Sequence, residues 1–144
     1  MKAIIHESTL HLRQRFRLRI QEWQNACICG GWGVMIMANP AQFKAPSYAG
    51  FAGPGEAWAA AFLLISALSF TALIINGTVP RPTAMLRTVA AGAQVFLYLL
   101  LSIGFAVSGT GTPGITTYGF LALFGFFGGI WALLDAVKPE YDAR

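Results

Sequence analysis

The stretch AWAAAFLLISALSFTALII, residues 57–75, decides the fold class, because it carries no charged side chain over its whole length. A helix needs about 20 predominantly apolar residues to cross the hydrocarbon core of a bilayer. The preceding sequence GPGE places Glu56 in the first turn of such a helix, where the helix dipole favours an acidic side chain. The stretch therefore predicts a helix that crosses a membrane.

The rest of the chain shares this apolar character. Its 144 residues are 56% hydrophobic and only 11% charged, and the mean hydropathy is +0.57. A soluble domain carries about 25% charged residues. Too few polar side chains remain to cover a water-facing surface, so we expect lipid to be the solvent around most of this single domain.

Three further stretches are candidate spans. Met85–Val107 has one charged side chain, Arg87, near its start, and Thr117–Ala136 has one, Asp135, in its last turn. The first candidate is weaker, since its purely apolar part, Ala26–Ala38, is too short to span alone. We predict an all-α integral membrane bundle of four transmembrane helices, with spans near residues 23–38, 57–75, 85–107 and 117–136.

The N-terminal region is basic. In HLRQRFRLRIQEW, residues 11–23, arginine occupies every second position from Arg13 to Arg19, while Leu12, Phe16 and Ile20 recur at helical spacing. This pattern predicts a basic amphipathic helical extension. We divide the chain into a cytoplasmic or interfacial arm (residues 1–22), a transmembrane domain (23–137) and a cytoplasmic tail (138–144).

Two kinds of partner attract such an arm. Anionic lipid headgroups bind juxtamembrane basic residues with about 1 kcal/mol each, and nucleic acid phosphates attract the same charges. The segment is short and lacks a recognition fold, and Phe16 and Trp23 suit a membrane-facing stripe. We therefore expect the lipid bilayer, and not nucleic acid, as the partner of the arm.

The distribution of lysine and arginine predicts the orientation. If the N-terminus is inside, Lys44 is the only basic residue outside. Basic residues accumulate on the cytoplasmic side of membrane proteins, so both termini should be cytoplasmic in a bacterial inner membrane. The basic residues inside are Lys2, Arg13, Arg15, Arg17, Arg19, Arg81, Arg87, Lys138 and Arg144. The six arginines from Arg13 to Arg87 lie where they can set the topology at the membrane surface.

Residue types that carry catalysis or bind metals are sparse. Cys27 and Cys29 lie too close together for a disulfide framework and are expected to be buried, reduced thiols. His6 and His11 do not share a helical face. No nucleophile motif and no phosphate-binding loop is present. We expect neither an enzyme nor a cofactor or metal site.

Polar side chains within the predicted spans are the default functional candidates. Glu22, Arg87 and Asp135 fall at the predicted cytoplasmic ends, where they anchor the helices or form ion pairs, Arg87 with Asp135 or with Glu22. Gln94 is the most deeply placed strongly polar side chain. We expect it to form an interhelical hydrogen bond in preference to a transport site.

Small residues predict close helix packing. Gly125 and Gly129 form a G-x-x-x-G pair, Ala122 extends the same face, and Gly30 lies in a glycine-rich part of the first span. Such residues let helices approach closely in lipid. The contact lies either between helices of one chain or between chains of an oligomer.

Three segments carry a family resemblance: APSYAGFAG, ALIINGTVPRPTAMLR and SGTGTPGITTYGFLALFGFFGGIWALLDA. Across residues 25–137 the chain resembles small four-span membrane proteins of unassigned function encoded by tailed bacteriophages and prophages. The most specific elements are Ile75–Gly77 followed by Pro82 and Arg87, and Ser108–Gly109 followed by Tyr118. Other members tend to be polar in the last span, where this chain is apolar.

The resemblance implies a context and no active site. Our leading hypothesis is a non-enzymatic membrane protein of this phage type that acts through helix association or docking, with a second copy or with phage or host membrane proteins as partners. A holin-like role in lysis belongs to this class, because holins are small, basic at one cytoplasmic end and self-associating. A small transporter or channel is the alternative from another class. A third hypothesis is a virion-associated component that enters the host membrane during genome delivery.

Overall fold

The computed structural model describes residues 19–75 and 80–137, and these residues form helices without strands. The all-α prediction is thereby confirmed for this part of the chain. The predicted arm up to residue 18, and with it Arg13, Arg15 and Arg17, lies outside the described residues. The elements are α2 (Ile20–Ala38), two short 3-10 helices η1 (Pro40–Lys44) and η2 (Pro46–Tyr48), α3 (Gly55–Ile74), α4 (Pro80–Val107) and α5 (Gly114–Val137).

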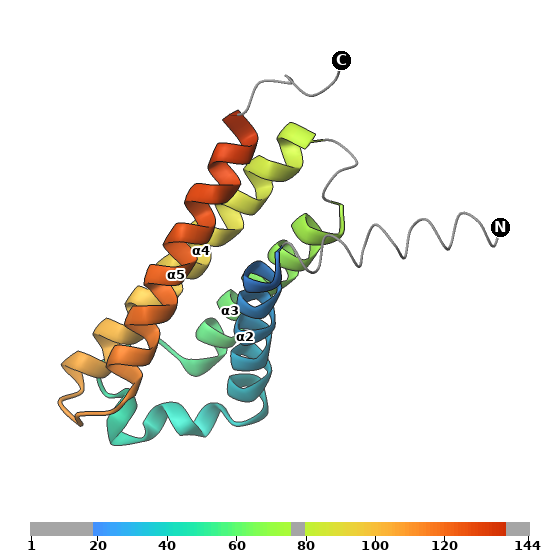
Figure 1. The fold of residues 1–144 in the computed structure, drawn as a ribbon. Helices are drawn as coiled ribbons and strands as arrows, with labels where there is room; N and C mark the ends of the chain where they lie inside the picture. Colours follow the sequence, from blue (N-terminus) through green and yellow to red (C-terminus); the bar gives the residue numbers. More distant parts are fainter. Residues whose placement is uncertain (1–18, 76–79, 138–144) are drawn as a thin grey trace, which may run out of the picture.

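Successive helices run in opposite directions, so α2 and α4 begin at the end of the bundle where α3 and α5 end (Figure 1). We call it the ionic end, because Arg19, Glu22, Arg87 and Asp135 meet there. The α2–α3 and α4–α5 pairs pack most extensively, and α3 packs on α4 between them. The fold is therefore two antiparallel hairpins joined along one seam.

Three of the described helices are long and apolar enough to cross a membrane: Gly55–Ile74, Pro82–Val107 and Gly114–Val137. They correspond to the predicted second, third and fourth spans. The predicted first span is helical over Ile20–Ala38 but is not among the three, because polar residues such as Gln21 and Gln24 interrupt its first turns. The membrane character is thus supported by three helices, and a fourth crossing remains a proposal.

The start of α4 differs from the prediction. The predicted span began at Met85, whereas the helix begins at Pro80. Proline suits the first turn of a helix, where its missing N–H has no intrahelical partner to lose and its fixed φ angle is already helical. Pro80 and Pro82 therefore both belong to the first turn of the helix.

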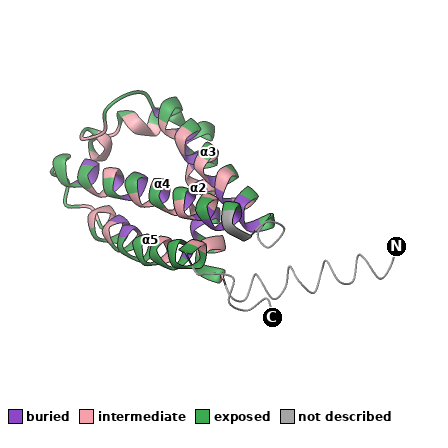
Figure 2. Cartoon of the chain, turned by 90° about the horizontal axis from the view of Figure 1, so that it is seen from above, coloured by how far each residue is buried: buried purple, intermediate pink, exposed green. Residues whose placement is uncertain are grey.

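The bundle core is formed by side chains from all four long helices. Ile36, Phe62, Tyr98 and Leu101 are the largest fully buried apolar side chains, and Tyr118 of α5 packs against the same cluster. Figure 2 shows buried residues on the inward faces and exposed residues along the outer face of α5. Apolar outer faces are expected for helices surrounded by lipid.

Aromatic rings close the end of the bundle opposite the ionic end. Phe51, between η2 and α3, contacts Phe105 of α4 at 5.0 Å between ring centroids and Trp58 of α3 at 5.4 Å. Gly104 makes this possible, since a Cβ there would lie 2.8 Å from the Phe51 ring. Burial in this cluster raises the pKa of the Tyr48 phenol above its ordinary value. The connection between α2 and α3 is therefore a packed part of the fold.

Candidate functional site

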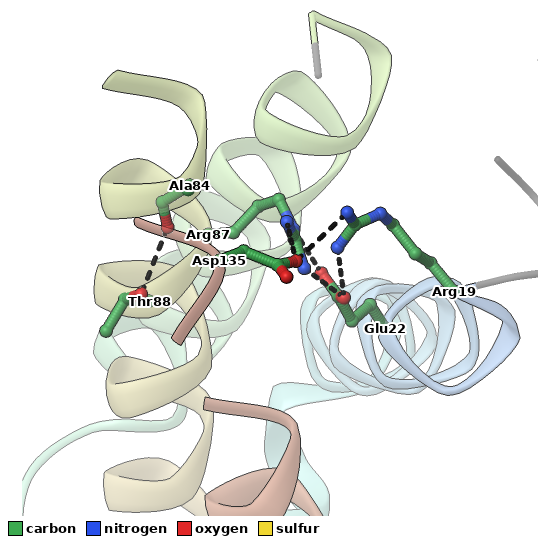
Figure 3. Close-up of polar contacts among 6 residues, drawn as sticks. All are labelled: Arg19, Glu22, Ala84, Arg87, Thr88 and Asp135. Atoms are coloured by element: carbon green, nitrogen blue, oxygen red, sulfur yellow. Dashed lines mark hydrogen bonds and ion pairs between the residues drawn. The ribbon is translucent and has the colours of Figure 1, made fainter. Parts of the chain in front are cut away.

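The best-defined polar site is a cluster of four charged side chains at the ionic end. Arg87 is its centre: its Nε donates to Glu22 Oε2 at 2.7 Å and its Nη2 donates to Glu22 Oε1 at 2.6 Å. Its Nη1 donates to Asp135 Oδ2 at 3.3 Å (Figure 3). Arg87 is only 3% exposed, so its guanidinium depends on these carboxylates in place of water.

Arg19 completes the cluster from the other side. Its Nη1 donates to Glu22 Oε1 at 3.2 Å and its Nη2 to Asp135 Oδ2 at 3.1 Å. Two cations thus alternate with two carboxylates, which leaves the cluster formally neutral. Neutrality and hydrogen bonding are what make a partly buried set of charges tolerable in a low-dielectric surrounding.

The helix ends explain part of this arrangement. Glu22 lies in the first turn of α2, where the helix dipole stabilises an anion. Asp135 lies in the last turn of α5, where the same dipole disfavours one. The contacts from Arg87 and Arg19 compensate the unfavourable position of Asp135, so the charges of three separate helices depend on one another.

The sequence named the right partners but left their arrangement open. It offered Asp135 or Glu22 as the partner of Arg87, and the structure brings Arg87 into contact with both. Arg87 was also grouped with the cations of the membrane surface, whereas the structure buries it. Arg19, from the same group, is half-buried in the cluster. Arg81 has no described side chain.

A second polar contact lies behind the cluster. Gln94 of α4 is buried and donates from Nε2 to Ser69 Oγ of α3 at 2.8 Å, while Ser69 Oγ donates to the Ile65 carbonyl at 2.7 Å. A cavity of about 20 Å³, lined in part by Glu22, Arg87, Ser69 and Gln94, separates this pair from the ion cluster. Gln94 therefore makes an interhelical hydrogen bond across the α3–α4 seam.

Further polar contacts in the interior were missed by the sequence analysis. The Tyr98 hydroxyl lies 3.4 Å from the Asn25 carbonyl and accepts from Cys29 Sγ at 3.5 Å. A signal for Tyr98 was present, since it follows Arg87 and Gln94 at a spacing that keeps all three on one face of α4. The expectation of buried thiols is confirmed for Cys29 and wrong for Cys27, which lies on the exposed face of α2; both cysteines are free.

The small residues face neighbours within the chain. A Cβ on Gly125 would lie 3.1 Å from Val95 Cγ2, and one on Gly129 would lie 3.5 Å from Ala91 Cβ, both on α4. Ala122 is buried in the same interface. A Cβ on Gly30 of α2 would lie 2.8 Å from Ser66 Oγ of α3. Of the two alternatives that the sequence left open, these positions match packing inside one chain.

An open cleft of about 440 Å³ adjoins the ion cluster, between the start of α2 and the end of α5. Gln21 bridges these two helices, because its Nε2 donates to the Phe124 carbonyl at 2.8 Å. The cleft is wide because α2 and α5 touch at few other places. Its lining consists of Arg19, Ile20, Gln21, Glu22, Arg87, Gly128, Trp131 and Asp135.

Comparisons with known proteins return no family model, no curated protein and no solved structure that matches this chain. Among the described residues, no group of three His, Cys, Asp or Glu side chains is placed to hold a metal ion. The likeness to phage-encoded membrane proteins stays a prediction from sequence. The ion cluster with its cleft and the exposed surface of α5 are the two features of the described residues that could contact a ligand or a partner.

Proposed function

We propose that this protein is a non-enzymatic, multi-pass protein of a bacterial cell membrane that acts by associating with a second copy of itself. In this proposal α2 also crosses the membrane and the ionic end faces the cytoplasm, as the charge asymmetry predicts. The observation that carries the proposal is an aromatic stripe on α5, formed by Phe120, Phe124, Phe127 and Trp131.

The stripe lies on the face of α5 opposite the face that packs on α4, and Trp131 at one end of it also borders the cleft beside α2. Its four members recur every three or four residues, so they share one helix face, and all four are exposed. The opposite face, with Gly125 and Ala132, is buried against α4. Helix association in lipid relies on van der Waals packing, and a ring pair contributes about 0.5–1.5 kcal/mol beyond burial of its area. A row of rings can interdigitate with the same row of a second copy.

Holin-like lysis is the biological role that we propose for this association. Support comes from the predicted basic arm and the phage resemblance. Docking to phage or host membrane proteins and membrane entry during genome delivery are the competing roles within the same class. Gene neighbourhood separates them, because endolysin genes favour lysis and tail genes favour delivery.

A small channel or transporter is the second candidate, favoured by the inward polar side chains Arg87, Gln94 and Tyr98. Towards the other end of α4 the interior is filled by rings: Phe105 stacks on Tyr118 with ring centroids 5.7 Å apart and Tyr98 lies 6.3 Å from Tyr118. A transport route would have to displace these rings. Association through α5 requires no such change, so we prefer it.

Cysteine crosslinking in membranes tests the association. In a background with Cys27→Ser and Cys29→Ala, Phe127→Cys places a thiol on the stripe and Leu64→Cys places one on the exposed face of α3. We expect oxidation to yield dimers of the Phe127→Cys chain and not of the Leu64→Cys chain. Equal dimer yields at both positions would mean random collision and would overturn the proposal.

Membrane-potential dye measurements during controlled expression test the lysis role. We expect abrupt depolarisation by the wild type and none by a Phe124→Ala, Phe127→Ala chain that reaches the membrane at the same level. If depolarisation instead rises steadily with expression and is also seen for the Phe124→Ala, Phe127→Ala chain, a single chain forms a channel. That result would contradict self-association. Absence of depolarisation by the wild type rules out holin-like lysis.

A further inference from the structure

We propose that the cleft at the ionic end binds the headgroup of an aminophospholipid, with Arg19 holding the phosphate and Asp135 holding the primary ammonium group. This inference requires that the chain lie in a bilayer, and it does not depend on self-association or lysis. It assigns a ligand class to the cleft beside Arg19 and Asp135, the two side chains of the ion cluster that bind the headgroup. Both are more exposed than Arg87.

The place and size of the cleft suit a headgroup. Its volume is about 440 Å³, within the range of about 300–1,000 Å³ typical of small-ligand sites. It opens beside the end of the apolar helix α5, and exposed Trp131 forms part of its lining. Tryptophan is enriched at the level of lipid headgroups, so the cleft lies where a headgroup would be.

The inner and outer ion pairs of the cluster have different geometry. Arg87 holds Glu22 through two short contacts, and its side chain is 2% exposed. Arg19 holds Asp135 through one contact at 3.1 Å, and these side chains are 22% and 37% exposed. The inner pair is fixed by bidentate hydrogen bonding. The outer pair is accessible from the cleft, so its partners can exchange.

Charge balance decides the headgroup class. A headgroup with one phosphate and one ammonium group, inserted between Arg19 and Asp135, gives each side chain an opposite charge and keeps the cluster neutral. A purely anionic headgroup would leave its negative charge beside Asp135. A quaternary ammonium group has no N–H to donate to the carboxylate. A primary ammonium group has three donors, so the site should prefer a primary amine.

Lipid retention measured by native mass spectrometry tests this inference. The protein is extracted from bilayers of equal mole fractions of phosphatidylethanolamine, phosphatidylcholine and phosphatidylglycerol. We expect phosphatidylethanolamine to be retained about tenfold over the other two. Asp135→Asn should remove the preference over phosphatidylcholine, and Arg19→Gln should reduce retention of phosphatidylethanolamine.

A steric variant keeps the test valid if the charge variants fail to fold. Gly128 lines the cleft and a Cβ there would meet nothing within 4 Å, so Gly128→Leu extends an apolar side chain into the cleft and leaves all four charged residues in the sequence. Gly31→Leu is the matched control, since Gly31 has equally open surroundings and lies on α2 away from the cleft lining. We expect retention to fall in the first variant and to persist in the second, with unchanged helix content in both.

Four results would overturn the inference. Preferential retention of phosphatidylglycerol would mean a general anion site, and equal retention of phosphatidylethanolamine and phosphatidylcholine would mean that Asp135 recognises no ammonium group. Displacement of the lipid by equimolar soluble glycerophosphoethanolamine would identify a soluble ligand in place of a lipid. Retention that is unaffected by Gly128→Leu would place the lipid elsewhere.

Discussion

The Arg87 guanidinium meets the Glu22 carboxylate through two parallel contacts, Nε to Oε2 at 2.7 Å and Nη2 to Oε1 at 2.6 Å. This fork geometry is among the strongest arrangements available to an ion pair. It connects the start of α4 with the start of α2, two helices that touch at few other points. The ion pair is therefore a main link between the two hairpins at this end of the bundle.

Replacing Arg87 should destabilise the fold strongly. In an Arg87→Gln chain Glu22 loses both short contacts while it remains partly buried, and breaking one partner of a buried pair costs about 3–5 kcal/mol. Arg87→Lys should recover only part of this loss, because an ammonium group lacks the planar fork. Unfolding by a denaturing detergent, followed by circular dichroism, measures the free energy of unfolding.

A double-mutant cycle supplies the control for this prediction. Glu22→Gln combined with Arg87→Gln removes both charges of the inner pair, so the double variant should lose less than the sum of the two single losses. Strictly additive losses would show that the two side chains do not interact in the folded state.

Bulky residues on the inner face of α5 should destabilise the bundle. A Cβ on Gly125 already lies 3.1 Å from Val95, so Gly125→Leu should lose a few kcal/mol, the scale of overpacking. Gly129→Leu should behave similarly, although Gly129→Ala should be tolerated because its Cβ would have an ordinary 3.5 Å contact with Ala91. Thermal stability in detergent measures both effects.

Two positions outside the α4 contact on the same helix serve as controls for the glycines. Gly128→Leu enters open space and Phe126→Leu faces outward, so both variants should retain wild-type stability. If Gly125→Leu also retained it, the α4–α5 contact would be looser than the structure shows. Loss of crosslinked dimers with an unchanged fold would instead place Gly125 between chains.

Gln94 should contribute a modest interhelical hydrogen bond. Gln94→Leu removes the donor to Ser69 Oγ, which keeps its own bond to the Ile65 carbonyl. We expect a loss of about 1 kcal/mol in the free energy of unfolding, the usual size of such bonds in membranes. Ser69→Ala should add little to the Gln94→Leu loss. A loss of transport with unchanged stability would instead favour the transporter hypothesis.

Reporter fusions test the proposed orientation. A reporter joined after Arg144 should be active in the cytoplasm, and one inserted within Pro40–Pro54 should be active outside it, because nearly all basic residues lie on one side. Arg13→Gln, Arg15→Gln and Arg17→Gln together should invert part of the molecules. This triple change leaves Arg19 and the ion cluster intact. A cytoplasmic signal from Pro40–Pro54 would contradict the four-span topology.

Span positions could be predicted because the bilayer imposes a simple physical requirement. Backbone polar groups must be satisfied within the segment and side chains must be apolar over about 20 residues, and residues 57–75 meet both conditions by composition alone. The same rule was ambiguous for α2, whose first turns carry polar side chains. Some of these, such as Asn25, turn out to be buried between helices.

The sequence narrowed the choice of ion-pair partners at the ionic end, but it did not determine which side chains pair with which. Arg87, Glu22 and Asp135 all fall at the same end of the bundle, so the predicted spans already placed these three residues at a similar depth in the membrane. The inclusion of Arg19 and the simultaneous contact of Arg87 with two carboxylates depend on how α2, α4 and α5 are arranged around one another. Span positions contain no information about that arrangement.

By itself the sequence determined that the described part of the chain is all-α, that three of the four predicted spans are apolar enough to cross a membrane, and that charge gathers at helix ends, because each property follows from local composition. Only the tertiary structure decided that Gly125 packs against α4, that the two hairpins meet at Arg87, and that a cleft opens between α2 and α5. The physical reason is that lipid covers any apolar face equally well, so hydrophobicity alone does not select which faces pack together. Close contacts, ion pairs and interhelical hydrogen bonds make that selection, and they exist only once the helices are assembled.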